Sequence, residues 1–128
     1  MYLTIQPILL NKLMNPDTKN KLFVQDDTLP WEVLSEKIKR KVMSYDASLM
    51  LVKVAFKAGG VGDVHQHEPI QISLVESGVF EIEINQVKKI LKAGDVFHIP
   101  SNVLHGAVCI EEGVLIDAFS PMRADFIK

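Results

Sequence analysis

The chain has 128 residues, of which 48% are hydrophobic and 23% are charged, and its formal net charge is −2. This length suits a single domain with one hydrophobic core. The composition excludes collagen-like, disordered and disulfide-rich chains. There is neither the basic excess of a nucleic-acid-binding protein nor the acidic block of an interaction tail. We therefore expect one globular domain that has no nucleic-acid partner.

Cys109 is the single cysteine of the chain, so no internal disulfide can form and no oxidising compartment is required. The apolar residues 1–13 lack the basic start and the small-residue cleavage site of a signal peptide. No segment approaches the roughly 20 apolar residues that a membrane span needs. These features predict a cytoplasmic protein that does not associate with a membrane.

The first part of the chain has no strong periodic pattern. Residues 15–30 are polar and rich in turn-forming types, which predicts an irregular lead-in. Apolar residues between Trp31 and Lys39 have helical spacing, which predicts a short helix, although residues 38–43 could equally begin a strand. We therefore expect an N-terminal extension over 1–30 and one domain over 31–128.

After Ser48 the apolar residues alternate with polar ones, as in a strand with one buried face. Met50, Val52, Val54 and Phe56 share one face of the first such segment. Six further segments have strand character: Ile70–Glu76, Val79–Ile84, Val87–Leu91, Asp95–Ile99, Val103–Cys109 and Val114–Phe119. In the second of them Phe80, Ile82 and Ile84 face inward, while Glu81 and Glu83 face outward.

Turn-forming residues separate these segments, among them Ser77–Gly78 and Glu112–Gly113. Many short strands with tight turns are typical of an antiparallel sandwich or barrel. The predicted fold class is therefore all-β.

Histidines dominate the candidate chemistry. His65 and His67 are two residues apart, so on an extended strand their side chains project from the same face, and Gln71 has the same parity. His105 lies near the start of a later strand that could reach across a small barrel. Three imidazoles and an amide oxygen could hold a first-row divalent ion. The alternative is that the histidines are ordinary surface or hydrogen-bonded residues.

The spacing around these residues resembles the two motifs of the cupin superfamily. In the first, Gly59, His65, His67, Gln71 and Gly78 are separated by five, one, three and six residues. In the second, Gly94, Pro100 and His105 are separated by five and four residues. The resemblance implies a single cupin domain, which is an RmlC-like jelly-roll barrel of antiparallel strands with a metal ion inside.

The cupin resemblance also implies which side chains hold the ion: His65, His67, Gln71 and His105. Gln71 stands where the motif usually has Glu, so every ligand would be neutral and the ion would keep its full double charge. The alternative is that Gln71 only faces the cavity and that the metal has three protein ligands. Cys109 occupies a motif position that does not ligate metal, and we expect His98 to line the cavity or pack.

The C-terminal strand carries a second candidate group. Asp117 and Phe119 share one face, and Arg123 follows the Ser120–Pro121 turn. We expect the shared face to line the cavity, because an outward-facing Asp between large apolar residues would be unusual. Arg123 could instead pair with Asp125 or Glu112 on the surface, and Phe119 could be an ordinary core residue.

From Trp31 onwards the chain resembles one cupin subgroup, the small pectin-degradation cupins of the KdgF type. The similarity rests on Trp31–Glu32, the metal-ligand motif, the turn at 91–95 and the tail with Asp117, Phe119 and Arg123. It implies an isomerase that opens 4,5-unsaturated monouronates to linear 4-deoxy-5-keto uronates. It also implies catalytic roles for the three residues of the tail.

The same resemblance implies a homodimer, a small anionic sugar as substrate, one divalent metal ion (Zn, Ni, Mn or Fe) and no organic cofactor. The sequence does not separate pectin-derived from alginate-derived substrates. Ile70 replaces an acidic residue that is common in the subgroup, which could change the substrate range. Other possibilities are a dioxygenase or sugar isomerase with the same metal site, or a non-catalytic cupin that binds a small molecule.

Overall fold

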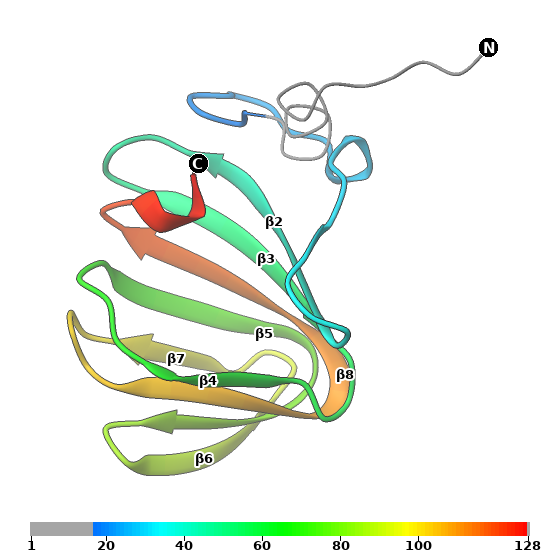
Figure 1. The fold of residues 1–128 in the computed structure, drawn as a ribbon, viewed down its shortest axis with the longest axis vertical. Helices are drawn as coiled ribbons and strands as arrows, with labels where there is room; N and C mark the ends of the chain where they lie inside the picture. The colour runs from blue at the N-terminus through cyan, green and yellow to red at the C-terminus, as the bar shows by residue number, and fades with distance from the viewer. Residues whose placement is uncertain (1–16, 128) are drawn as a thin grey trace.

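The computed structural model describes residues 17–127, which form an all-β domain with two short 3-10 helices. The strands are β1 (Glu32–Val33), β2 (Ile38–Tyr45), β3 (Met50–Phe56), β4 (Val61–His65), β5 (Ile70–Ile84), β6 (Val87–Lys92), β7 (Val96–Ile99) and β8 (His105–Ser120). All of them pair antiparallel. Figure 1 shows two layers of strands, joined where β8 bends from one layer into the other. The predicted fold class is confirmed.

Two long strands, β5 and β8, run through both layers. The first half of β5 pairs with the end of β8 and with β7, and its second half pairs with the start of β8 and with β6. β3, β2 and β1 extend the first layer beyond β8, and β4 lies beside β8 in the second layer. This path produces the jelly-roll, open on the side away from the bend.

The turns predicted at Ser77–Gly78 and Glu112–Gly113 are wrong, because both pairs lie inside the long strands. Register shifts occur there between Val75 and Phe80, so β5 and β8 bend together instead of ending. Gly78 has a φ of +81°, and a Cβ on Gly113 would lie 2.0 Å from the Ser77 carbonyl oxygen. Glycine is a common turn residue, but here the two glycines allow the backbones of β5 and β8 to come close together at a bulge.

The helix predicted between Trp31 and Lys39 is also wrong. Glu32 and Val33 pair with Arg40 and Lys39, so this segment is a tight hairpin at the edge of the sheet. The alternative of a strand that begins at residue 38 is confirmed by β2. Leu34 is 45% exposed, so the helical spacing of its neighbours does not produce a buried face.

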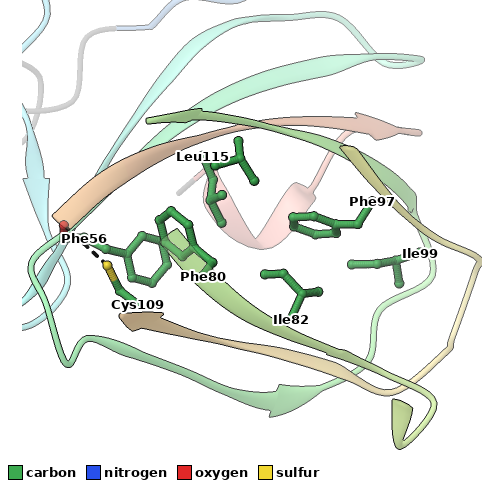
Figure 2. Packing of buried hydrophobic residues seen from close by; sticks show 8 residues of the cluster. Phe56, Phe80, Ile82, Phe97, Ile99, Cys109 and Leu115 are labelled. Atoms are coloured by element: carbon green, nitrogen blue, oxygen red, sulfur yellow. Dashed lines mark hydrogen bonds between the residues drawn. The ribbon is translucent and has the colours of Figure 1, made fainter. Parts of the chain in front are cut away.

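The hydrophobic core lies between the two layers, as Figure 2 shows. Its fully or almost fully buried side chains come from β3, β5, β7 and β8: Phe56, Val75, Phe80, Ile82, Phe97, Ile99, Cys109 and Leu115. The rings of Phe56 and Phe80 pack edge to face, with centroids 5.2 Å apart. The inward faces predicted for residues 50–56 and 80–84 are confirmed. Burial of these side chains is the main favourable contribution to folding.

The described part of the N-terminal lead-in packs on β2. Residues 17–30 contain the 3-10 helix η1 (Asp26–Thr28) and are otherwise irregular apart from an isolated bridge, as predicted. Thr18 donates a hydrogen bond to the Val42 carbonyl oxygen, and Lys41 donates one to that of Asp26. Residues 15 and 16 lie outside the described range, and the domain boundary at residue 30 stays a prediction. Within residues 17–127, no helix is long and apolar enough to cross a membrane.

Candidate metal centre and active site

Three histidines that are far apart in the sequence come together near one end of the second layer. His65 ends β4 and pairs directly with His105, the first residue of β8, while His67 lies in the connection to β5. One nitrogen from each ring lies within 4.8 Å of the others. His65 is exposed, His67 is half-buried and His105 is buried, so the cluster opens towards solvent on one side. These rings could hold a metal ion.

Backbone carbonyls orient all three imidazole rings. The Nδ1 atoms of His65, His67 and His105 lie 2.7 to 2.8 Å from the carbonyl oxygens of Asp63, Pro69 and Val103, respectively. A carbonyl oxygen can only accept, so each Nδ1 carries the hydrogen and each Nε2 of a neutral ring keeps a lone pair. This arrangement is typical of metal-binding histidines, whose second nitrogen is held by a backbone or carboxylate partner.

Two of these rings favour the neutral form. Burial lowers the pKa of His105 to about 4, against the opposing effect of its hydrogen bond to Val103. Burial likewise lowers the pKa of His67. At neutral pH both Nε2 atoms therefore offer lone pairs, which is the form in which histidine binds a metal.

Gln71 extends this group of electron-pair donors. Its Oε1 lies 3.1 Å from the Nε2 of His67, whose Nδ1 already donates to Pro69. A neutral imidazole has one N–H, so no proton lies between the Gln71 oxygen and the His67 Nε2. Ligands at right angles around a first-row metal ion, each about 2.1 Å from it, lie about 3 Å apart. The donor set therefore fits a divalent cation, with Gln71 next to His67.

A buried chain of hydrogen bonds leads from Gln71 to Asp117. The Gln71 amide donates to the Ser73 hydroxyl at 2.9 Å, and that hydroxyl donates to Asp117 Oδ1 at 2.6 Å. Ser73 and Asp117 are direct cross-strand partners on β5 and β8, and Gln71 has the same parity as Ser73. All three side chains are at most 7% exposed. The inward orientation predicted for Asp117 is confirmed, and the register of two strands forms the chain.

Asp117 is the buried acid of the site. Burial raises the pKa of its carboxyl group to about 6, although the hydrogen bond from Ser73 and the charge of Arg123 both act to lower it. A group with this pKa exchanges a proton readily near neutral pH. The sequence predicted that Asp117 points inward, and in the structure its carboxyl accepts a hydrogen bond from the buried Ser73.

Phe119 and Arg123 lie beside the histidines. The Phe119 ring packs edge to face on His67, with centroids 5.6 Å apart, and is 2% exposed. The Arg123 guanidinium lies 5.2 Å from the centre of the Phe119 ring. Phe119 also belongs to a hydrophobic cluster with Met50 and Val52, so it both contacts His67 and packs in the core.

Arg123 makes the ion pair that the sequence offered as an alternative to a role in the site. Its Nε and Nη2 donate to the two carboxylate oxygens of Asp125 at 2.9 and 2.7 Å. The Arg123 residue is nevertheless only 8% exposed, so the arginine of this ion pair is buried and does not lie on the surface. The guanidinium also lies 4.3 Å from the centre of the Phe126 ring. The pair with Asp125 therefore holds Arg123 in place beside Phe119.

Three further residues that the sequence motifs singled out lie away from the cluster. His98 was expected to line the cavity or pack, but it is exposed on the outer face of β7, because Phe97 and Ile99 take the inward positions. Cys109 is buried in the hydrophobic core, where its thiol donates to the Glu111 carbonyl oxygen. Ile70 is 41% exposed and faces away from the cluster, so its side chain is not part of the candidate site.

Ser73 is the site residue that the sequence analysis missed. An inward-facing serine in the pattern IQISLV, two residues after Gln71, is the signal that could have identified it. A separate hollow of about 510 Å³ lies near the bend of the barrel, between the β1–β2 hairpin and residues 112–114 of β8. It is lined by Trp31, Lys37 and Phe56 among others, and by none of the residues of the candidate site.

We expect Asp117→Asn to stabilise the metal-free fold at neutral pH. The carboxyl has a pKa of 3.8 in an unfolded chain and about 6 in the folded one, so folded protein binds this proton more tightly. The Asp117 contribution to stability is therefore present below about pH 4 and is lost as the pH rises through 6. The loss amounts to at most about 3 kcal/mol, and Asn avoids it.

Urea unfolding of both proteins in a chelator, at several pH values, measures this effect. The free energy of unfolding of Asp117→Asn minus that of the parent should be constant below pH 4 and grow up to about pH 6. The histidines titrate in the same range but are present in both proteins, so they cancel in the difference. A difference that does not change between these pH values would contradict the assignment.

Comparisons with known proteins agree with this geometry. The profile of the cupin domain family matches residues 52–118. The pectin degradation protein KdgF of Dickeya dadantii (strain 3937) is 47% identical over 109 residues, which cover 84% of this chain and 98% of that protein.

Two solved structures also match most of the chain. An RmlC-like cupin from Shewanella frigidimarina NCIMB 400 is 39% identical with a TM-score of 0.83, and the match covers 87% of this chain and 100% of the other. The structure of KdgF from Halomonas sp. is 39% identical with a TM-score of 0.80, covering 82% and 97%. The chain therefore belongs to the cupin superfamily and, within it, to the family of the pectin degradation protein KdgF.

Proposed function

We propose that this cupin is a metal-dependent isomerase that opens the ring of 4,5-unsaturated monouronates, the products of pectin or alginate lyases, to linear 4-deoxy-5-keto uronates. The single observation that carries the proposal is the buried Asp117 carboxyl beside a cluster of neutral metal-binding donors. Kinship with pectin degradation proteins supports the class of substrate.

The substrate is a cyclic enol ether that carries a carboxylate. Ring opening removes the proton of the anomeric hydroxyl and breaks the bond between the anomeric carbon and the ring oxygen, which leaves an aldehyde and an enolate. A proton then adds to the former alkene carbon, and the enolate oxygen becomes the keto oxygen. One proton leaves and one returns, so the product is an isomer and no redox partner is needed.

In the proposed mechanism Asp117 moves the proton. Its carboxyl has a pKa raised to about 6 by burial, so it can accept the hydroxyl proton and return it to carbon near neutral pH. Among the described residues, the hydrogen bond from Ser73 engages its Oδ1, which leaves Oδ2 to face the reacting atoms. Phe119 shapes the cavity and excludes water beside His67.

In the proposed mechanism, the negative charges of the substrate are stabilised by the cation site and by Arg123. We propose that His65, His67, Gln71 and His105 hold one divalent ion, which is Zn, Ni, Mn or Fe. When bound, such an ion supplies a Lewis-acidic positive centre for the carboxylate and the enolate oxygen. Arg123 contributes a second positive charge at the same cavity and is well suited to a carboxylate. No organic cofactor takes part in these steps.

We expect purified protein to carry about one divalent ion per chain, and His65→Ala and His105→Ala to remove most of it. Loss of one of few protein ligands weakens a metal site severely, because each ligand supplies a large share of the binding energy. Elemental analysis after dialysis measures the content. His98→Ala is the matched control, because His98 is an exposed histidine outside the cluster and should leave the content unchanged.

Equal metal content in the parent and in both cluster variants would contradict the ligand assignment. Circular dichroism of each variant separates loss of metal from loss of the fold.

Turnover is tested with the unsaturated monouronates released from polygalacturonate and from alginate by lyases. The ultraviolet absorbance of the conjugated enol ether should disappear in the presence of the metal-loaded protein. We expect Asp117→Asn to lower kcat by about 100- to 10,000-fold, the range for loss of a general acid or base. The control Asp27→Asn changes an exposed carboxylate of the lead-in and should keep parental activity.

Parental turnover in Asp117→Asn would remove Asp117 from the mechanism. If the parent binds these uronates without consuming them, the chain is a binding cupin and the proposed reaction is wrong. A comparison of kcat/KM for the two lyase products identifies which source of uronate is preferred.

We also propose that the chain works in the cytoplasm as a homodimer. The free thiol of Cys109, buried in the core, suits a reducing compartment. The outer face of the first layer is mainly apolar where β3, β8, β5 and β7 lie side by side. Its side chains Leu51, Ile70, Ile72, Leu74 and Val96 are 41 to 56% exposed. An exposed apolar patch of this kind is typical of an interface between protein chains.

Ile72→Glu combined with Leu74→Glu should convert the dimer to a monomer, because it places charges at the centre of this face. Sedimentation velocity measures the mass of each species. Ile90→Glu is the control, since Ile90 is 66% exposed but lies on β6, away from the face. A parent that sediments as a monomer, or a charged variant that remains a dimer, would contradict the proposed interface.

A further inference from the structure

Ser73 lies between the candidate metal ligands and the proposed proton-transfer group. Its side chain is 0% exposed on the inner face of β5. Its hydroxyl oxygen has two partners, the Gln71 amide at 2.9 Å and Asp117 Oδ1 at 2.6 Å. Its hydroxyl therefore connects the Gln71 amide on β5 with the Asp117 carboxyl on β8.

The number of hydrogens on Ser73 restricts the orientation of Gln71. A hydroxyl group has one hydrogen to donate, and an ionised carboxylate can only accept. Ser73 donates its hydrogen to Asp117, so it can only accept from Gln71. The Gln71 amide must then turn its NH₂ group towards Ser73 and its Oε1 towards the Nε2 of His67, 3.1 Å away.

The opposite orientation of the amide is incompatible with a cation. It would direct two N–H groups at the histidines and would leave the Gln71 oxygen against the lone pairs of Ser73. The bond from Ser73 to Asp117 is short and has a charged acceptor, so it is among the stronger hydrogen bonds of the site. It therefore determines which atom of Gln71 faces the cluster.

We propose that Ser73 is a positioning residue, which fixes the Gln71 amide with its oxygen towards the histidines and thereby raises the affinity of the cluster for a divalent cation. The inference rests on the metal site of the proposed function, and it is independent of the reaction. Groups that hold metal ligands in place commonly change metal affinity by about 10- to 100-fold when they are removed.

A double-mutant cycle on metal affinity tests the role of Ser73. The parent, Ser73→Ala, Gln71→Ala and the double variant are stripped of metal, and Zn²⁺ affinity is measured by competition with a chromophoric chelator. We expect Ser73→Ala to weaken Zn²⁺ binding by about 10-fold or more in the parent. In the Gln71→Ala background, the same change should alter the affinity by less than about twofold, because the residue that Ser73 positions is gone.

Val75→Ala is the matched control. Val75 is the next inward-facing residue of β5 and is also 0% exposed, but it belongs to the hydrophobic cluster and has no polar partner. Its truncation leaves a cavity and lowers the free energy of unfolding. We expect the Zn²⁺ affinity of this variant to stay within about twofold of the parental value, because mutations at sites that share no partners act independently.

Cobalt substitution gives a second readout. The visible absorption of bound Co²⁺ depends on the number and type of its ligands, so the Ser73→Ala spectrum should shift towards that of Gln71→Ala. If Ser73→Ala does not fold, Ser73→Gly serves in its place. It also lacks the hydroxyl and adds no new metal ligand, and the same direction of change is expected.

Parental affinity in Ser73→Ala would overturn the positioning role, and so would an equal loss in the parent and in the Gln71→Ala background. A parent that binds no Zn²⁺ or Co²⁺ would overturn the metal site and this inference together. Absence of turnover in a protein that binds metal as described would instead contradict the proposed reaction alone.

Discussion

The pairing of β5 with β8 places Gln71 opposite Phe119 and Ser73 opposite Asp117, and the contacts of the site depend on that register. Side chains alternate between the faces of a sheet, so a shift of one residue in either strand would turn its whole set outward. The bulge near Gly78 and Gly113 fixes the register, because these strands approach there too closely for a side chain. A backbone feature of the core thus determines the geometry of the polar site.

The electrostatics of the site follow from which groups are charged. The proposed metal donors are three neutral imidazoles and an amide, so a bound cation would keep its full charge. Arg123 adds another positive charge near His67 and His105, where it acts to lower the pKa of both rings. The nearby carboxylate Asp117 is buried and has a raised pKa. Such an arrangement of charges favours an anionic ligand, and this agrees with the kinship to pectin degradation proteins.

Local patterns in the sequence predicted much of the fold and of the candidate site. The period-two alternation predicted the inward face of β3, the apolar neighbours of Asp117 predicted that its side chain points inward, and the motif spacing predicted that His65 and His105 come together. Predictions failed where a local pattern has two structural uses. Ser77–Gly78 forms a bulge rather than a turn, because the partner strand continues beside it.

Other features depend on contacts between distant residues. The helical spacing near Trp31 was overridden by pairing of Glu32 with Arg40. The contribution of Ser73 arises only when it meets Asp117, which is 44 residues away in the chain. No local pattern specifies that partner, since it requires the register of two long strands. The position of His98 follows from its neighbours: Phe97 and Ile99 are buried, so the side chain between them points to the outer face of β7.

The way in which Arg123 is held has a consequence for binding of the substrate. Its Nε–H and one N–H of Nη2 are engaged by Asp125, so among the hydrogen bonds of the described residues both N–H groups of Nη1 and the second N–H of Nη2 are left for an incoming carboxylate. The guanidinium cannot swing far, because it packs on the rings of Phe119 and Phe126. The proposed anionic substrate would therefore meet a cation whose position is already set, and the entropy of ordering a long side chain is lost on folding rather than on binding. Asp125 weakens the field of Arg123 but holds its guanidinium beside Phe119, and a fixed position of charged groups is what the proposed ring opening would require.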